Sequence, residues 1–423
     1  MDVVDNSVLR FLPNPGWRWS VSGRNFGHPW DRGALRTGEQ KTNAPKSGDG
    51  SASSPSAIAQ GTADGSAQVE LCGYGKTNPI RTTDDYPPEV VRAAERAFAA
   101  VADRLSAQHP PTARAVGLYA RLVAAVRRAG EEDQRLNPNC TDTPCIQRRF
   151  KAAGDAARPQ AEELARLAVA SQDPRTYSMA LFGCRLNRDS EACSQLSVAR
   201  WSQLEPDNAV PWFYIAEESA ARKDEAALSD ALFRAGQAKT SDYHWPTIFA
   251  MAEDPAARDL APAPRLVYLS RLLGIYAAFP APPYLVVSNA CSAEKMADSA
   301  RRRLCVDLAT MMTERSKSLV EHSLGTAIGE RGGWPADQVQ HLRDEKDAIN
   351  IVDRKDWVAE DVHSCRFLEQ LEVRTKELVE LGELPSARQK LAASGRSVAA
   401  MAQEWRDLQR QSSNTPTATA GSK

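Results

Sequence analysis

The chain has 423 residues, of which 42% are hydrophobic and 25% are charged, so it is long enough and apolar enough to build a folded core. Its formal net charge is −1, which leaves no overall positive field to attract nucleic acid or an anionic membrane. No stretch approaches the roughly 18–20 uncharged apolar residues that a membrane-spanning helix needs. We therefore expect neither a nucleic-acid partner nor a transmembrane segment.

The first 85 residues show neither helical nor strand periodicity and are rich in Gly, Ser, Pro and Thr. This composition cannot bury enough apolar surface to offset the entropy of ordering, so it predicts a disordered N-terminal segment over residues 1–85. Four aromatic residues are unusual for a linker and could dock on a surface: Trp17, Trp19, Phe26 and Trp30. The start of the sequence has no basic region followed by an apolar core, so no signal peptide is visible.

Residues 86–410 read as an α-helical domain, and residues 411–423 as a disordered tail. The first helix shows apolar residues at Val91, Ala94 and Phe98, spaced three and four apart, with prolines before and after it. A second helix ends near Gly130. Further helices are expected over residues 145–171, 174–186, 190–203, 209–222, 224–238, 242–252, 263–279, 283–296, 300–330, 335–350, 357–382 and 385–410.

The stretch LEPDNAVPWFYIAEES, residues 204–219, contains a helix end, a turn and a helix start. Pro206 ends the preceding helix, because it lacks an N–H group and its ring clashes with the previous turn. Asp207 or Asn208 can then cap the next helix, in whose first turn Pro211 is tolerated. The residues expected to share one face of this helix are Trp212, Ile215 and Ala216.

At this junction the sequence resembles a tetratricopeptide repeat, a helix pair of 34 residues with the pattern Trp-x2-Leu-Gly-x2-Tyr. Pro206 and Asn208 match the turn between repeats, and Trp212, Ile215 and Ala216 match Trp, Leu and Gly. Ser219 departs from the pattern, since Tyr is expected there, and no Pro-Asx turn recurs one period later. The overall texture is also similar to a family of helical proteins from GC-rich proteobacteria that carries no known activity. The resemblance implies an all-α fold of stacked helical hairpins, a TPR-like α-solenoid.

The eight cysteines contain no Cys-x-x-Cys pair, which argues against a zinc ribbon or a thioredoxin-type site. Their spacing suggests three local disulfides, Cys140 with Cys145, Cys184 with Cys193 and Cys291 with Cys305, and leaves Cys72 and Cys365 to pair over a long range. Cys291 and Cys305 can meet only if the chain reverses between them, since one straight helix would hold them roughly 20 Å apart. The alternative is eight buried free thiols. Disulfides favour an exported or periplasmic protein, whereas the lack of a signal peptide favours the cytoplasm.

No motif for catalysis or cofactor binding stands out. Gly75-Lys76-Thr77 matches the end of a phosphate-binding loop, but Glu70 occupies the position of the first required glycine and Pro79 prevents the following helix. The six histidines include no His-Glu-x-x-His pair, and no Gly-x-Ser-x-Gly elbow is present. We therefore expect no cofactor, no metal and no catalytic residue that the sequence can identify.

One aromatic cluster, Tyr243, His244 and Trp245, follows the repeat-like helix pair. On the rim of a helical repeat such a cluster can anchor a peptide. The alternative is that it packs as a cap on the helix pair.

The sequence favours a non-catalytic binding or scaffold module for an unknown protein or peptide, because stacked hairpins present a concave surface. Two alternatives remain: an enzyme whose site is dispersed over several helices, and a structural protein of the cell envelope tethered by its N-terminal segment. The enzyme hypothesis requires a deep pocket with a perturbed acid or histidine. The sequence does not determine the partner or the oligomeric state.

Overall fold

The computed structural model describes residues 68–80, 85–140, 142–357 and 362–414. These residues are mostly helical, with little sheet, so the described part of the protein is all-α as predicted. The N-terminal aromatic residues, from Trp17 to Trp30, and residues 415–423 lie outside the described part of the chain.

A small β-hairpin precedes the helices and corrects the prediction of disorder up to residue 85. Strands β1 (Val69–Leu71) and β2 (Gly75–Thr77) pair antiparallel. The hairpin is fixed from outside, because Cys72 forms a disulfide with Cys365 and its amide donates to the carbonyl of His363 (2.9 Å). The Gly-Lys-Thr sequence thus forms a strand and not a phosphate-binding loop. Local composition could not reveal this clamp, since the partner residues lie near the other end of the chain.

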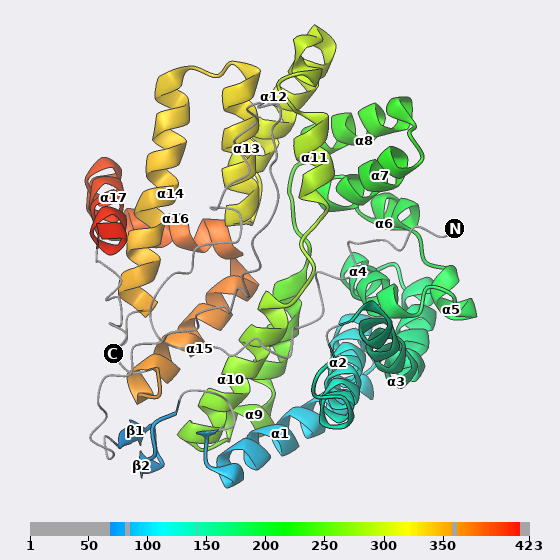
Figure 1. Cartoon of the computed structure of the whole chain (residues 1–423), viewed down its shortest axis with the longest axis vertical. Coiled ribbons are helices and arrows are strands. Elements are labelled where there is room, and N and C mark those ends of the chain that lie inside the picture. The colour runs from blue at the N-terminus through cyan, green and yellow to red at the C-terminus, as the bar shows by residue number, and fades with distance from the viewer. Residues whose placement is uncertain (1–67, 81–84, 141, 358–361, 415–423) are drawn as a thin grey trace, which may run out of the picture.

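The first helices pack in chain order at one side of the molecule (Figure 1). Gly117 allows a close crossing of α1 and α2, because a Cβ atom there would lie 2.2 Å from the backbone nitrogen of Ser106. The second helix continues beyond Gly130, where the sequence predicted its end, since a glycine inside a helix costs only about 1 kcal/mol. The elements are α1 (Pro88–Ser106), α2 (Pro111–Leu136), α3 (Thr143–Ala170), α4 (Pro174–Gly183), the 3₁₀ helix η4 (Cys184–Leu186) and α5 (Glu191–Ser194).

The stretch around Pro206 folds as predicted, between α6 (Val198–Leu204) and α7 (Ala209–Ala221). Asn208 caps α7, with its side-chain oxygen accepting from the amide of Val210 (3.2 Å). Ala216 is fully buried against α8 (Glu225–Gln237). Trp212 and Ile215 are half-buried at the edge of the same cluster.

The middle of the chain returns to the first helices and then moves away again (Figure 1). Helix α10 packs against α1, so segments far apart in the sequence lie side by side. From there the chain continues to α12 and α13, which follow α8 in the packing order. The elements are the 3₁₀ helix η5 (Trp245–Glu253), α9 (Pro255–Arg258), α10 (Pro262–Ala277), α11 (Tyr284–Ala290), the 3₁₀ helix η6 (Lys295–Ala297), α12 (Ser299–Glu314) and α13 (Leu319–Gly332).

Two long helices of the sequence prediction are broken in the structure. The expected helix over 300–330 divides into α12 and α13, because Ser318 ends the turn and caps α13 through the amide of Val320 (3.2 Å). The expected helix over 385–410 divides at Gly395, whose φ of 63° is left-handed. The last helices are α14 (Ala336–Trp357), α15 (Cys365–Glu380), α16 (Glu383–Ala393) and α17 (Val398–Asn414), the last of which extends into the segment predicted as a tail.

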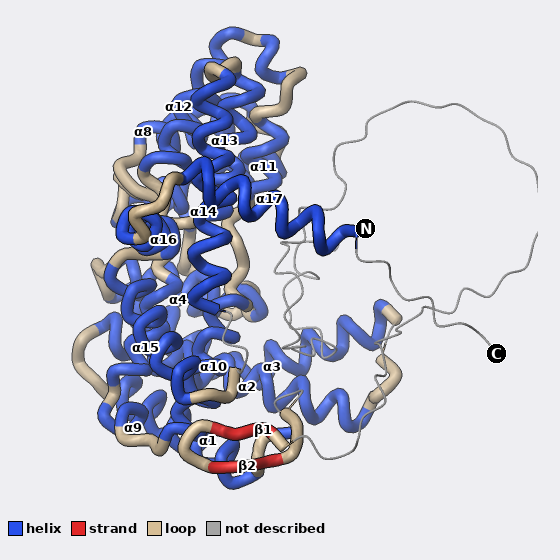
Figure 2. The backbone as a smooth tube through the Cα atoms, turned by 90° about the vertical axis from the view of Figure 1, so that its left-hand side faces the viewer, coloured by secondary structure: helices blue, strands red, loops and turns tan. Residues whose placement is uncertain are grey.

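Besides the hydrophobic group around the Cys184–Cys193 disulfide, which joins α2, α3, η4 and α5, three others lie within the described residues. The largest joins the hairpin, α1, α2, α4, η5, α10 and α15, and Figure 2 shows the hairpin at the same end as α1 and α9. A second lies among α7, α8, α11, α12 and α13, and a third joins α14, α16 and α17. Because α15 packs on η5 and α10, the C-terminal part of the chain closes against the N-terminal part.

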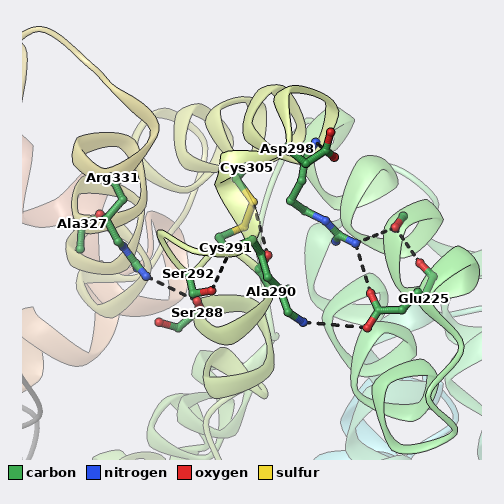
Figure 3. The surroundings of a disulfide bond; sticks show 12 residues. Glu225, Ser288, Ala290, Cys291, Ser292, Asp298, Cys305, Ala327 and Arg331 are labelled. Atoms are coloured by element: carbon green, nitrogen blue, oxygen red, sulfur yellow. Dashed lines mark hydrogen bonds and ion pairs between the residues drawn. A yellow bond between two sulfur atoms is a disulfide. The ribbon is translucent and has the colours of Figure 1, made fainter. Parts of the chain in front are cut away.

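All eight cysteines form disulfides, in the pairs that their spacing suggested. Figure 3 shows the bond between Cys291, which follows α11, and Cys305 of α12. The chain reverses between them, as the prediction required. Beside this bond, Arg331 of α13 donates to the carbonyl of Ser288 in α11 (3.5 Å).

Candidate functional site

Four loops between helices lie side by side near the centre of the molecule. The amide of Ala209 donates to the carbonyl of Thr240 (2.9 Å). The amide of Lys317 donates to the carbonyl of Ser241 (3.2 Å), and that of Leu384 to the carbonyl of Lys317 (3.0 Å). We call this set the loop ladder; it comprises residues 205–209, 238–244, 315–318 and 381–384, which follow α6, α8, α12 and α15.

A cavity of about 380 Å³ lies beside the loop ladder, where α2, α4, η5, α10 and α15 meet. This volume is within the range of small-ligand sites, roughly 300–1,000 Å³. Apolar residues of its wall include Ala113, Val116, Ala250, Leu378 and Val379. Its charged residues are Arg175, Asp242, His244, Lys317 and Glu383, of which all but Arg175 belong to the ladder.

His244 is the most constrained residue of the cavity. Its backbone is left-handed, with φ 61°, and its side chain is buried. Its Nε2 lies 2.9 Å from a carboxylate oxygen of Glu205, and its Nδ1 lies 3.5 Å from Oδ1 of Asp242. Burial alone would lower the pKa of His244, but the hydrogen bond to Glu205 and the charge of Asp242 outweigh it, so the pKa is raised.

Asp242 is held as a carboxylate by its neighbours. Its Oδ2 lies 2.6 Å from Nζ of Lys317, and its Oδ1 accepts from the amide of His244 (2.8 Å). Burial would raise the pKa of Asp242, but the positive charges of His244 and Lys317 lower it overall. The pairing of Asp242 with His244 thus favours the carboxylate form of the one and the protonated form of the other.

The two remaining charged residues have different surroundings. Glu383, the first residue of α16, accepts the amide of Leu319 (3.0 Å) and so helps to cap α13. Arg175 lies in the first turn of α4, with an exposed side chain. Within the described residues, no carboxylate lies within ion-pair distance of its guanidinium.

The aromatic cluster predicted from the sequence divides between the cavity and the core. Tyr243 and His244 line the cavity. Trp245 is only 3% exposed, and its ring centroid lies 3.6 Å from that of Phe279 and 4.2 Å from that of Phe182. Trp245 thus belongs to the core and presents no surface to a partner.

Two buried clusters lie outside the cavity wall. Tyr284 donates to Oε1 of the fully buried Glu321 (2.7 Å), whose pKa is raised mainly by burial. In the second cluster, Glu345 of α14 accepts from Arg388 of α16 (2.8 Å) and lies 2.8 Å from Nε2 of His322 on α13. Burial would raise the pKa of Glu345, but these two partners lower it to about 2. This second cluster joins three helices.

Sequence reasoning missed four of the cavity's charged residues: Arg175, Asp242, Lys317 and Glu383. They come from separate parts of the chain, and no motif or spacing links them. The only usable signal was the aromatic cluster next to Asp242, which identified one wall of the cavity.

Within the described ranges, no three His, Cys, Asp or Glu side chains are grouped so as to hold a metal ion. None of the described helices has the length and apolarity to cross a bilayer. Comparison of the chain with family models, with curated proteins and with solved structures finds no match in any of the three.

Proposed function

We propose that the protein is a non-catalytic binding module that holds a segment of a partner protein, or a peptide, in the central cavity. The observation that carries this proposal is a cavity with a largely apolar wall and a set of charged groups fixed by the loop ladder. Apolar walls with a few oriented polar groups are typical of binding sites, because burial supplies affinity and the polar groups set orientation.

The protonation states of the cavity favour binding over acid–base catalysis. A general base must lose and regain a proton near neutral pH. The raised pKa of His244 and the lowered pKa of Asp242 instead favour the charged form of each group. Glu321 has a raised pKa, but it does not line the cavity.

The proposal includes a solenoid-like arrangement for part of the chain. Helices α7, α8, α12 and α13 pack each against the next, and the repeat-like junction at Pro206 opens this series. A solenoid aligns its inter-helix loops on one side, and the backbone pairing of the loops after α8 and α12 supports this part of the proposal. The four disulfides support a place in an oxidising compartment.

A site-specific photo-cross-linker tests whether the cavity receives a partner. Val379 lines the cavity and is 49% exposed, whereas Val373 lies on the same helix, is 56% exposed and is not part of the wall. We expect p-benzoylphenylalanine at position 379, but not at 373, to yield one adduct of defined mass in extracts of cells that make the protein.

The partner identified from that adduct should then protect residues 242–247 and 375–384 from hydrogen exchange. Equal cross-linking at the two positions, or no adduct at position 379, would show that the cavity does not receive a partner protein or peptide.

A further inference from the structure

The charges around the cavity are matched within the protein, with one exception. The matched groups are the imidazole of His244, the ammonium of Lys317 and the carboxylates of Asp242 and Glu383. The exception is the guanidinium of Arg175, which has no ion-pair partner in the described part of the chain. A ligand entering the cavity therefore meets one unmatched positive charge.

The acidic residue nearest to Arg175 in the sequence is already used. Asp173 caps α4 by accepting the amide of Thr176 (3.1 Å), and it also accepts the hydroxyl of Thr112 (2.5 Å). These bonds direct its carboxylate to the helix end. Arg175 also lies close enough to His244 for their positive charges to repel each other. An anion bound beside Arg175 would relieve this repulsion.

We infer that the cavity binds an apolar carboxylate, which pairs with Arg175 while its apolar group packs against Val116 and Leu378. This inference rests on the proposed function, because it names the chemistry of the group that the same cavity holds. The planar guanidinium can donate two parallel hydrogen bonds to a carboxylate, which gives orientation as well as affinity. The apolar wall accommodates the rest of the group.

The charge of the ligand is limited by the acids of the cavity. Asp242 and Glu383 both line it, so a doubly charged group such as a phosphate monoester would be repelled by two carboxylates while pairing with one guanidinium. A single negative charge matches the single unpaired cation. A carboxylate therefore fits better than a phosphate.

Two sources supply this chemistry, the C-terminal residue of a peptide and a free organic acid. The probes are N-acetyl-leucyl-leucine for the first and octanoate for the second, each compared with its amide by isothermal titration calorimetry on the full chain. We expect at least one acid to bind roughly ten- to hundredfold more tightly than its amide, the usual effect of a charge-assisted hydrogen bond. The acid that binds more tightly identifies the source.

The variant Arg175→Gln should remove the advantage of the acid over the amide, and Arg175→Lys should retain part of it, since lysine keeps the charge without the planar fork. Arg303→Gln is the matched control, because Arg303 is exposed on α12 and lies outside the cavity wall. It should bind as the parent does, and circular dichroism checks that all variants fold.

Equal binding of acids and amides, an advantage that survives in Arg175→Gln, or no binding of either acid at millimolar concentration would overturn the inference. These binding results are independent of the cross-linking at Val379, which tests the proposed function separately. Conversely, a clear preference for an acid without any cross-linked partner would leave the carboxylate site standing and refute the protein-binding proposal.

Discussion

The side-chain amide of Asn208 bonds to both backbone polar groups of Asp242, which lies 34 residues further along the chain. Its Nδ2 donates to the carbonyl (2.6 Å), and its Oδ1 accepts from the amide (3.0 Å). Asn208 is fully buried and also caps α7. One side chain thus holds the loop before α7 beside the loop that carries Asp242 and His244 to the cavity.

Replacing Asn208 with Ala should therefore lower the free energy of unfolding by roughly 3 kcal/mol, because the cap is lost and buried backbone groups are left without partners. Urea unfolding measures this change. Asp207→Ala is the control, since its side chain is 60% exposed and pairs with the exposed Lys239; it should cost less than about 1 kcal/mol. A similar loss in both variants would contradict the bridging role of Asn208.

The helical architecture was predictable from the sequence because it depends on local signals. Ala94 and Phe98 of the predicted stripe lie on the buried face of α1, where Val90 is buried and Val91 only half-buried, and Pro206 and Asn208 define the junction before α7. The three local disulfide pairs also followed from spacing. These features need only neighbouring residues, or a chain reversal over a short segment.

The cavity could not be predicted in the same way. Asp242, Lys317 and Glu383 meet because the loops after α8, α12 and α15 pair through their backbones, and no side-chain pattern marks that pairing. The hairpin was missed for a related reason, since Cys72 is fixed by a residue 293 positions away. The cavity and the hairpin thus depend on packing between distant segments, which local periodicity does not reveal.

The disulfides predict that the cysteines are protected in the native host. The thiol state of the cysteines is first trapped before the cells are lysed, and the protein is then alkylated in denaturant. All eight cysteines should stay unmodified until a reductant is added, because paired sulfurs do not react as thiolates. Intact mass measures the result. Modification of all eight without reductant would place the protein in a reducing compartment instead.

The four disulfides should differ in how readily they are reduced in the folded protein. Cys365 is exposed, whereas both sulfurs of the Cys184–Cys193 and Cys291–Cys305 pairs are buried. Since exchange requires a thiolate to reach a sulfur, Cys72–Cys365 should open before those two pairs.

Limited treatment with dithiothreitol, followed by alkylation and peptide mapping, gives the order. The buried Cys291–Cys305 pair is the internal control. Its reduction at the same rate as Cys72–Cys365 would show that reduction follows global unfolding and not exposure.

His244 should titrate at a higher pH than an ordinary histidine, because its pKa is raised by the hydrogen bond to Glu205 and the charge of Asp242. Its raised pKa means that its contribution to the free energy of unfolding is fully present below pH 6.5, its usual pKa, and is lost as the pH rises through the higher folded value. The imidazole nitrogen shifts of the folded protein report its titration directly. His109, which is exposed, provides the comparison. A titration of His244 below pH 6.5 would contradict the ion-pair geometry with Glu205 and Asp242.

Glu345 should make the stability depend on acid. Its pKa is lowered from 4.5 to about 2, so its stabilising contribution is present above pH 4.5 and is lost as the pH falls towards 2. At pH 7, Glu345→Gln should destabilise the protein by roughly 2 kcal/mol, because it removes the carboxylate that the buried His322 and the partly buried Arg388 share.

The difference between the parent and Glu345→Gln, measured by urea unfolding, should shrink as the pH is lowered from 6 to 3. Glu330→Gln is the matched control, since Glu330 pairs with Arg343 in a half-exposed ion pair, and it should change stability by less than about 1 kcal/mol. A difference for Glu345→Gln that stays constant with pH would mean that the carboxylate is not ionised within the cluster. Helices α13, α14 and α16 would then be joined by packing and neutral hydrogen bonds alone.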